Sequence, residues 1–382
     1  MHRILVIGYE PGIHGIATAA RNLYFHLDRN AFQYDYLIRE RSKGNIDRDL
    51  SRMRKYGAHI HYMDYLPTGF TTDNLNRLRE LLISIPNICG VHVHDFALNV
   101  DPLILANEMK LPVKIIHSHV QATEEMIKKR RLSSLEKKKL NAIRSDRFVR
   151  LACSNYSGDY AFGGLSYTII RNAIDVKRFS YNHVHRSIVR KSLNIPDNAP
   201  VLGFVGAHDD RKNPMFALRV FNAFHRLDPS SHMIITGNGY LFEDLKEYVH
   251  KEGLSEHTHF LGYQNEIELF FNAMDLLIVP SKSEGLPYAL IEAQACGLQC
   301  LVSDSISRMS IITPLITMLP LKQGAFVWAE TVYSKLNESQ KRISDSIKIT
   351  DAGYDIRETI KRIEHIYDSC LTNNAESFDK DD

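Results

Sequence analysis

The chain has 382 residues, enough for two or three domains of ordinary size. Hydrophobic residues make up 44% and charged residues 24%, a balance typical of folded globular domains, so a mainly disordered chain is excluded. The formal net charge is +2, from 47 basic and 45 acidic residues. We therefore expect no strongly basic nucleic-acid-binding domain and no nucleic-acid partner.

Neither a targeting segment nor a disulfide framework is visible in the sequence. The first residues, MHRILVIG, form too short an apolar run for a signal peptide. No stretch approaches the roughly 18 apolar residues of a membrane-spanning helix. The five cysteines are odd in number and mostly far apart, so we expect reduced thiols, most of them buried. These features predict a cytoplasmic protein that can touch a membrane but does not cross it.

The first half of the chain alternates short β-branched runs with longer segments of helical period. This alternation predicts a parallel sheet covered by helices on both faces. In chain order, we expect strands at 4–7, 34–38, 58–62, 90–94, 113–117, 148–153 and 167–170, with helices at 18–26, 74–83 and 132–143 between them.

The alternation breaks between residues 175 and 200, where the sequence is charged, rich in histidine and carries a Pro-Asp-Asn turn signal. A second series then begins. It predicts strands at 201–205, 233–236, 258–261, 276–279 and 299–302, with helices at 215–226, 241–250, 267–273 and 288–295. We therefore predict an α/β protein with two doubly wound, Rossmann-like domains that face each other across a cleft. Such sheets bind ligands at the carboxyl ends of their strands.

The end of the chain predicts one long helix, because Ile356, Ile360, Ile363 and Tyr367 recur at helical spacing and share one face. The last residues, ESFDKDD, are polar and acidic. We accordingly divide the chain into a first domain at 1–180, a second domain at 181–353, and a terminal helix with its tail at 354–382.

The segment 276–298 has the pattern of a strand, a loop, a helix and a stop. Glu284 lies just before the expected helix and Glu292 in its second turn, so both can point toward the carboxyl edge of the sheet. Free N–H groups at a helix start bind phosphate, and a carboxylate can accept two hydrogen bonds from a ribose diol. The spacing of the two glutamates alone is weak evidence for a site. Glu330 and Glu338 have the same spacing but lack the strand-loop-helix pattern, and they fit a solvated helix face.

Two other strand-to-helix loops of the second half are candidates for ligand binding. A strand ends at Gly206, and the following helix starts just after Arg211 and Lys212. The helix dipole disfavours cations at a helix start unless they bind an anion such as a diphosphate. The alternative is a basic turn exposed to solvent. Gly237 and Gly239 form the turn after the next strand, where the backbone can approach a ligand closely or simply turn tightly.

The first half offers weaker signals. The loop 8–15 bears glycines but lacks the full GxGxxG spacing, so we expect no dinucleotide fingerprint.

His117 and His119 close a strand and share one face, so both imidazoles can point into the cleft, and His92 and His94 repeat the pattern one strand earlier. A metal site would need a third and a fourth ligand, and no obvious cluster supplies them, so we expect no metal. Core or edge histidines are the alternative for both pairs.

The segment 128–147 contains nine Lys or Arg residues against two acidic residues. As a helix it would present a basic face, with Leu132, Leu135, Leu140 and Ile143 on another face. Such a helix can rest on an anionic membrane surface or meet a lipid-linked phosphate. A solvated charged helix is the alternative.

Together these segments resemble the retaining glycosyltransferases of family 4, which have the GT-B fold, and within them the bacterial group that builds capsular and exopolysaccharides. The resemblance runs through most of the chain. Its motifs are GFVGAHDDRKN, IITGNGYLFEDL, HFLGYQNEI and SKSEGLPYALIEAQACGL in the second half, and HSH, ACSNYSGDYAFG and IIRNAIDVKRF in the first. The stretch EGLPYALIEAQACG is the most specific of them.

The resemblance implies transfer of a hexose, with retained configuration and without a metal or other cofactor, from a nucleotide sugar to a glycan or polyprenyl-diphosphate-linked acceptor. UDP is expected only as the commonest donor nucleotide of the family. By resemblance, Glu292 would hold the ribose hydroxyls, Glu284 would lie near the transferred sugar, and Lys212 would neutralise the diphosphate. His119 would contact the sugar or polarise the reaction, with His117 as its competitor for that role.

The resemblance also implies contacts from backbone loops. Gly15 would approach the diphosphate from the first domain, and Asn172 and Asp175 match the segment before the interdomain linker. The terminal helix would cross back to the first domain. The implied donor-binding residues are Gly15, Gly206, Arg211, Lys212, Gly237, Gly239, Glu284, Gly285, Leu286 and Glu292.

Two positions depart from the family pattern. Ala207, followed by His208, stands where the family usually has Arg, so one diphosphate contact is missing; either Arg211 compensates or donor affinity is lower. His14 replaces a commoner Gly. Two other functions remain open: a sugar-nucleotide epimerase of the same architecture, and an inactive polysaccharide-assembly protein, for which Ala207 is the only hint. For the enzyme, we expect a cytoplasmic location at the inner face of the cell membrane.

Overall fold

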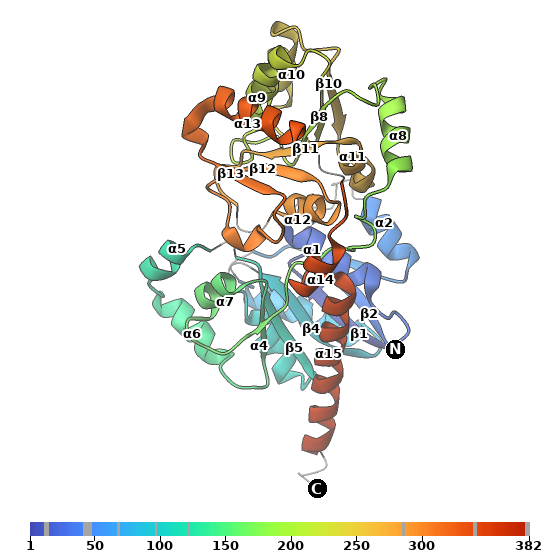
Figure 1. Cartoon of the computed structure of the whole chain (residues 1–382). Coiled ribbons are helices and arrows are strands. Elements are labelled where there is room, and N and C mark those ends of the chain that lie inside the picture. The colour runs from blue at the N-terminus through green and yellow to red at the C-terminus, as the bar shows by residue number, and fades with distance from the viewer. Residues whose placement is uncertain are drawn as a thin grey trace. The chain divides into compact units, whose positions relative to one another are not determined.

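The computed structural model describes residues 1–10, 15–40, 48–66, 69–95, 98–120, 122–284, 287–338 and 342–378. The chain divides into two compact units, which we call the first and the second domain (Figure 1). The first domain comprises Met1–Ala173 together with Ile356–Asp382, and the second comprises Ile174–Asp355.

The first domain is built on a parallel seven-stranded sheet. Its strands are β1 (His2–Ile7), β2 (Phe32–Arg39), β3 (His59–Met63), β4 (Ile88–Asp95), β5 (Val113–Ser118), β6 (Val149–Ala152) and β7 (Thr168–Ile169). They lie in the order β3-β2-β1-β4-β5-β6-β7. Because the order runs outward in both directions from β1 and β4, this is the doubly wound arrangement that the alternation predicts.

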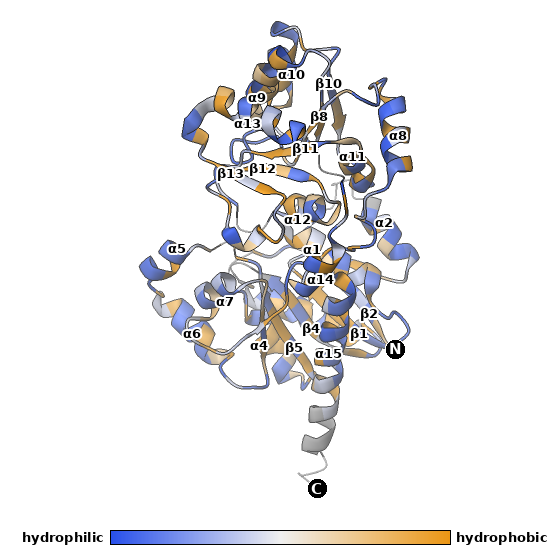
Figure 2. Ribbon diagram, in the orientation of Figure 1, coloured by the Kyte–Doolittle hydropathy of each residue, from blue (hydrophilic) through white to orange (hydrophobic). Residues whose placement is uncertain are grey.

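Helices cover both faces of this sheet. They are α1 (Gly15–His26), α2 (Arg48–Lys55), α3 (Thr72–Ser84), α4 (Asp101–Glu108), α5 (Glu124–Lys129), α6 (Ser134–Ala142), α7 (Asn155–Phe162) and α15 (Ile356–Phe378). Ile4 and Val6 of β1 belong to one buried apolar cluster, whereas Leu5 and Ile7 belong to another. Successive strand residues point to opposite faces, so the strand is buried on both sides and its residues 4–7 are all apolar. Figure 2 shows this apolar character along β4 and β5 as well.

The C-terminal helix α15 completes the first domain. Its residues Ile356, Ile360, Ile363 and Tyr367 all lie in the cluster that also holds Ile4. The helix packs against α1 and β5. The spacing of these four residues therefore predicted the buried face of the helix correctly.

The second domain is built on a parallel six-stranded sheet. Its strands are β8 (Val201–Val205), β9 (His232–Thr236), β10 (Thr258–Gly262), β11 (Leu276–Val279), β12 (Gln299–Ser303) and β13 (Ile316–Leu319). They lie in the order β10-β9-β8-β11-β12-β13, so the order reverses between β8 and β11. The helices are α8 (His183–Ser192), α9 (Pro214–Leu227), α10 (Phe242–Lys251), α11 (Ile267–Ala273), α12 (Tyr288–Ala295), α13 (Gly324–Asn337) and α14 (Ser346–Asp351).

The domain boundaries differ from the positions expected from the sequence. The chain enters the second domain at Ile174 rather than at residue 181, because Ile174 and Phe179 are buried in its apolar core. It leaves after Asp355 rather than residue 353, because Tyr354 lies in the same core and its carbonyl accepts a hydrogen bond from the N–H of Ile174 (2.9 Å). The two connections between the domains thus run side by side.

The cysteines are free thiols, as expected; four are buried and Cys370 is half-buried. Among the described residues, no helix combines the length and the apolar character that a membrane span requires.

Candidate active site

The loop after β8 carries two of the predicted cations. Arg211 and Lys212 come directly before α9, whose N-cap residue, Asn213, has a left-handed φ of 58°. The N–H of Lys212 donates to Oδ1 of Asp209 (2.8 Å), which fixes the turn. Asp209 was not among the residues singled out from the sequence, although an Asp three residues before a loop N–H is a known turn signal. The turn holds both cations at the carboxyl end of β8.

Glu284 brings these cations together. It lies between β11 and α12, and its Oε1 accepts a hydrogen bond from Nη1 of Arg211 (3.1 Å) and forms an ion pair with Nζ of Lys212. The Glu284 side chain is 2% exposed, that of Lys212 17% and that of Arg211 44%. β8 and β11 are neighbours in the sheet, and the N–H of Lys282 donates to the carbonyl of Arg211 (2.8 Å), so the two loops are tied together.

This cluster can bind an anion by exchange. The buried carboxylate orders both cations and offsets part of their charge, while almost half of the Arg211 side chain faces solvent. Guanidinium and ammonium groups are the usual partners of phosphate oxygens. A phosphate group reaching this site would compete with Glu284 for Lys212.

The two glycines after β9 are required by backbone packing inside the domain. A Cβ on Gly237 would lie 1.8 Å from the carbonyl oxygen of Gly206, and a Cβ on Gly239 would lie 2.3 Å from that of His208. Gly237 also has a φ of 119°. The loops after β8 and β9 therefore touch each other, and the N–H of His208 donates to the carbonyl of Asn238 (2.9 Å).

The position that departs from the family pattern is occupied by small and neutral groups. Ala207 is half-buried, and the following His208 is fully buried and stacked on Phe242, with the ring centroids 5.9 Å apart. Burial lowers the pKa of His208. An uncharged imidazole cannot supply the charge of the missing arginine, so Arg211 and Lys212 are the cations of this loop region.

The other predicted donor residues lie in both domains. Glu292 is half-buried on α12. Gly15 is the exposed first residue of α1 in the first domain, and a Cβ there would meet no atom within 4 Å. Gly285, Leu286 and His14 lie outside the described residues.

The four histidines at the ends of β4 and β5 form one cluster in the first domain. His94 pairs with His117 in the register of the two strands, and the centroids of the His117 and His119 rings lie 4.2 Å apart. All four side chains are buried: His92 and His94 on β4, His117 on β5 and His119 directly after it. The rings gather as expected from the shared strand face, and their burial fits the alternative of core histidines that the sequence left open.

Each of these rings has defined partners. Nε2 of His117 contacts the carbonyl of Ile170 (3.2 Å), and Nδ1 of His119 contacts Oδ1 of Asn172 (3.0 Å). Nδ1 of His94 contacts Nε2 of His119 (2.9 Å). Both nitrogens of His119 are therefore engaged. Burial lowers the pKa of His119 to about 4, so the ring is neutral at physiological pH.

The cluster also brings one ring nitrogen each from His92, His94 and His117 within 4.8 Å of one another, a grouping that the sequence did not reveal. The rings of His92 and His94 are stacked, with centroids 4.3 Å apart and an 18° angle between their planes. Because the nitrogen lone pairs lie in the ring planes, those of two stacked rings lie in nearly parallel planes, which do not meet at a point close to both rings. A tetrahedral Zn²⁺ needs converging nitrogens about 3.3 Å apart, so we assign no metal ligands here.

The two residues predicted before the linker belong to different domains. Asn172 lies in the first and contacts His119. Asp175 lies in the second, where its Oδ1 accepts from the N–H of Lys177 (3.2 Å) and of Arg178 (3.4 Å) and so closes a turn.

The basic segment 128–147 contains the end of α5 and the whole of α6 rather than one continuous amphipathic helix. Leu132, Leu140 and Ile143 pack into the core of the first domain, and only Leu135 of the four predicted apolar residues is largely exposed, at 62%. The apolar face is therefore used inside the domain and is not available to a membrane.

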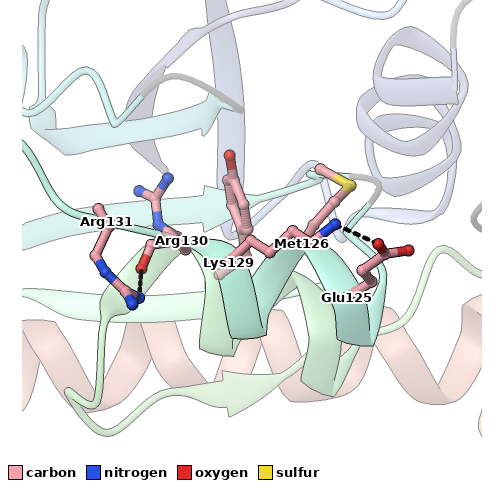
Figure 3. A pocket seen from close by; sticks show the side chains of 6 residues that line it. Glu125, Met126, Lys129, Arg130 and Arg131 are labelled. Atoms are coloured by element: carbon pink, nitrogen blue, oxygen red, sulfur yellow. Dashed lines mark hydrogen bonds and ion pairs between the residues drawn. The ribbon is translucent and has the colours of Figure 1, made fainter.

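A depression of about 400 Å³ lies beside α5 (Figure 3). The guanidinium of Arg130 lies 4.0 Å from the centroid of the Tyr160 ring. Lys129 is paired with Glu125 (2.5 Å) and Arg130 with Glu136 (2.9 Å), so part of the positive charge is already offset. The lining residues are Glu125, Met126, Lys129, Arg130, Arg131 and Tyr160.

Comparisons with known proteins agree with this architecture. Residues 185–345 match the family model described as Glycosyl transferases group 1. Over 363 residues the chain is 26% identical to the protein named "Putative glycosyltransferase EpsF" of Bacillus subtilis (strain 168), covering 92% of this chain and 93% of that protein. It is 24% identical over 352 residues to the capsular polysaccharide biosynthesis glycosyltransferase CapH of Staphylococcus aureus, covering 88% and 90%.

Two further comparisons add a partial relative and a structure. Over 140 residues, 36% of each chain, the sequence is 32% identical to the UDP-Gal:alpha-D-GlcNAc-diphosphoundecaprenol alpha-1,3-galactosyltransferase of Escherichia coli. The crystal structure of Alr3699/HepE from Anabaena in complex with UDP and glucose superposes with a TM-score of 0.69 at 16% identity, covering 97% of this chain and 100% of that chain. The chain therefore has a GT-B fold, residues 185–345 match the Glycosyl transferases group 1 model, and the sequence is similar to bacterial polysaccharide glycosyltransferases.

Proposed function

We propose that this protein is a retaining glycosyltransferase that moves a hexose from a nucleotide sugar, with UDP as the first candidate, to a glycan or polyprenyl-diphosphate-linked acceptor in bacterial surface polysaccharide synthesis. The observation that carries the proposal is the Arg211–Lys212–Glu284 cluster at the carboxyl ends of β8 and β11. In a doubly wound sheet, this edge beside the reversal of strand order is where ligands bind.

The proposed chemistry follows from charge. When the sugar leaves the nucleoside diphosphate, negative charge develops on phosphate oxygens. Lys212 and Arg211 stabilise that charge, so the transfer itself requires no divalent metal and no other cofactor. Glu284 holds both cations in place before the donor arrives. We nominate no protein nucleophile, because the departing phosphate can help to deprotonate the acceptor hydroxyl on the same face.

The remaining donor contacts in the proposal follow the resemblance. Glu292 on α12 would hold the ribose hydroxyls, and Gly15 would approach the diphosphate. HepE was crystallised with UDP and glucose, and the partial relative from Escherichia coli is named for a UDP-Gal donor and a diphosphoundecaprenol-linked acceptor. These names support UDP and a lipid-linked acceptor as the first pair to assay.

The experiment starts with a thermal-shift screen of UDP, GDP and their sugars, since a ligand that binds only the folded protein raises its apparent stability. Transfer is then assayed with the nucleotide sugars that bind and an undecaprenyl-diphosphate-linked sugar. We expect Lys212→Ala and Glu292→Ala each to lower transfer about 100-fold or more, with unfolding still cooperative.

The matched control is Lys335→Ala, which removes an exposed ion pair with Glu338 in the same domain and should leave transfer unchanged. Full activity in both site variants would remove the site assignment. Interconversion of the free nucleotide sugar without transfer would identify an epimerase, and no turnover with any pair would favour an inactive assembly protein.

We also propose that the exposed cations of α6 hold the protein at an anionic membrane surface from the cytoplasmic side. Lys137 and Lys138 are exposed and, with the depression beside α5, lie in the same basic segment. Anionic lipid attracts such residues by about 1 kcal/mol each at low salt.

Flotation with phosphatidylglycerol vesicles should carry the protein upward at low salt. The double variant Lys137→Glu/Lys138→Glu should stay at the bottom, whereas a reversal of Lys246 and Lys251 on α10 should not; absence of flotation by the unmodified protein contradicts the proposal.

A further inference from the structure

A continuous chain of hydrogen bonds passes through the buried His119. Nδ1 of His119 lies 3.0 Å from Oδ1 of Asn172, and Nε2 of His119 lies 2.9 Å from Nδ1 of His94. The three groups come from different parts of the first domain: β4, the end of β5 and the segment that leads to Ala173. His119 is 6% exposed and His94 2% exposed, so water does not compete for these contacts.

The partners determine where the protons lie. An amide oxygen can only accept, so Nδ1 of His119 must carry a hydrogen. A neutral imidazole has one donor and one acceptor, so Nε2 of His119 then has a lone pair and accepts from Nδ1–H of His94. Nε2 of His94 is left as an acceptor, and it is one of the buried atoms without a hydrogen-bond partner in the described part of the chain.

The surroundings keep the ring uncharged. Among the side chains that the structure describes, the imidazoles of His94 and His117 face it, and His92 lies in the same cluster with the Tyr367 hydroxyl of α15 at 2.7 Å. Burial lowers the pKa values of His92, His94 and His117 well below the usual range, and the histidines lower one another's values further. None of these groups is an anion, so none of them favours the imidazolium form of His119.

We propose that Asn172 and His94 are positioning residues that hold His119 in a single neutral form, protonated at Nδ1 and unprotonated at Nε2. As a consequence, His119 contributes to sugar transfer as an uncharged dipole rather than as a cation beside the diphosphate. This consequence rests on the proposed function, whereas the protonation state can be measured without any substrate.

The first experiment is an NMR spectrum of the full chain labelled with ¹⁵N-histidine, in which the two nitrogens of a neutral ring give different shifts according to which carries the hydrogen. The His119 signal is assigned by its loss in His119→Gln. We expect a neutral ring with Nδ1 protonated, unchanged from pH 8 to pH 5.5. A ring protonated at Nε2, or one that becomes charged in this range, overturns the proposal.

The second experiment uses Asn172→Asp, which keeps the shape and the acceptor but adds a negative charge 3.0 Å from the ring. We expect this change to raise the pKa of His119 by about 1–3 pH units. The control is Asn76→Asp, the same change at an exposed position on α3. An unchanged pKa of His119 in Asn172→Asp overturns the proposal. Should this variant fail to fold, the spectrum of the unmodified protein tests the proposal by itself.

Kinetics supply the link to transfer. In Asn172→Asp, kcat should fall as the pH drops through the raised pKa of His119. The unmodified protein and Asn76→Asp should show no such fall of kcat. A loss of kcat that is equal at all pH values would overturn the positioning role. If the unmodified protein transfers no sugar, the proposed function fails, but the NMR result still stands or falls by itself.

Discussion

Lys212 and Glu284 form a buried ion pair that joins the loop after β8 to the loop after β11. Arg211 shares the same carboxylate at 3.1 Å. In the free protein, the Glu284 carboxylate therefore pairs with the two cations that we propose bind the diphosphate. Donor binding would exchange one anion for another at a site whose side chains are already in place, so little reorganisation is left for the reaction itself.

The exchange predicts different effects of Glu284→Gln on binding and on transfer. The amide keeps the shape but no longer neutralises Lys212, so UDP should bind as tightly as before or more tightly. The cations are no longer held by a charge, so kcat should fall about 100-fold. Calorimetric titration with UDP and steady-state transfer give the two numbers; Glu338→Gln, beside the exposed Lys335, is the control. A weaker UDP affinity with an unchanged kcat would contradict this role.

The contact between the loops after β8 and β9 predicts that Gly237 tolerates no side chain. In Gly237→Ala, the new Cβ would lie 1.8 Å from the carbonyl oxygen of Gly206, so the backbone must move, and the φ of 119° adds strain. We expect a loss of about 2–5 kcal/mol in the free energy of unfolding of the second domain.

The matched control for this prediction is Gly253→Ala. Gly253 also has a positive φ, 73°, but its Cβ would meet nothing within 4 Å, so only the conformational cost of about 1–2 kcal/mol applies. Urea unfolding followed by tryptophan fluorescence reports on this domain, because the one tryptophan, Trp328, is buried there. Equal losses in the two variants would show that the contact with Gly206 does not matter.

The sequence predicted the strands well because most of them are buried on both faces. β11 and residues 4–7 of β1 are uninterrupted apolar runs, which only a covered parallel sheet requires. β13 was missed, since Ile316–Leu319 is a half-buried edge strand with a mixed sequence. The domain boundary was misplaced because the burial of Ile174 and Phe179 depends on packing against residues distant in the chain, which local composition does not reveal.

The site shows the same limit. Lys212 and Glu284 could each be singled out from a strand-loop-helix pattern, but their contact follows from the strand order, in which β8 neighbours β11. Likewise, alternation placed His117 and His119 on one face, whereas their contacts with His94 and Asn172 come from the register of β4 with β5 and from the path of the chain after β7. A single sequence does not reveal which segments distant in the chain lie side by side.

Buried neutral histidines in both domains predict a marked loss of stability in acid. Burial lowers the pKa of His119 to about 4, and burial followed by the neighbouring His257 lowers that of His232 to about 4. Unfolded histidine titrates near 6.5, so the unfolded chain binds more protons as the pH falls from 6.5 toward 4. Stability should be constant above pH 7.5 and fall across this window.

The size of the loss can be checked at one residue. His119 alone should account for about 2 kcal/mol between pH 7.5 and pH 5. Urea unfolding of the unmodified protein and of His119→Gln at both pH values measures this share as the difference between the two pH-dependent losses. Equal losses would mean that His119 is already charged in the folded protein.

The buried ion pair of Arg3 and Asp35 predicts a strong asymmetry between single and double substitutions. The Arg3 side chain is 6% exposed and that of Asp35 is fully buried, and the carboxylate also lies 2.7 Å from Nε2 of His61 and 3.3 Å from Nδ1 of His59. Arg3→Met leaves that carboxylate in the interior without its guanidinium, so the first domain should lose about 3–5 kcal/mol.

The double variant Arg3→Met/Asp35→Asn removes both charges and should recover much of that loss, because the burial of an unpaired charge, rather than the absence of the pair, is the costly state. Urea unfolding of the single and double variants at pH 7.5, followed by far-ultraviolet circular dichroism, gives the comparison. The exposed pair Lys361–Glu358 on α15 serves as the reference, since neutralising Lys361 there should cost less than about 1 kcal/mol. A double variant as unstable as Arg3→Met would contradict this prediction.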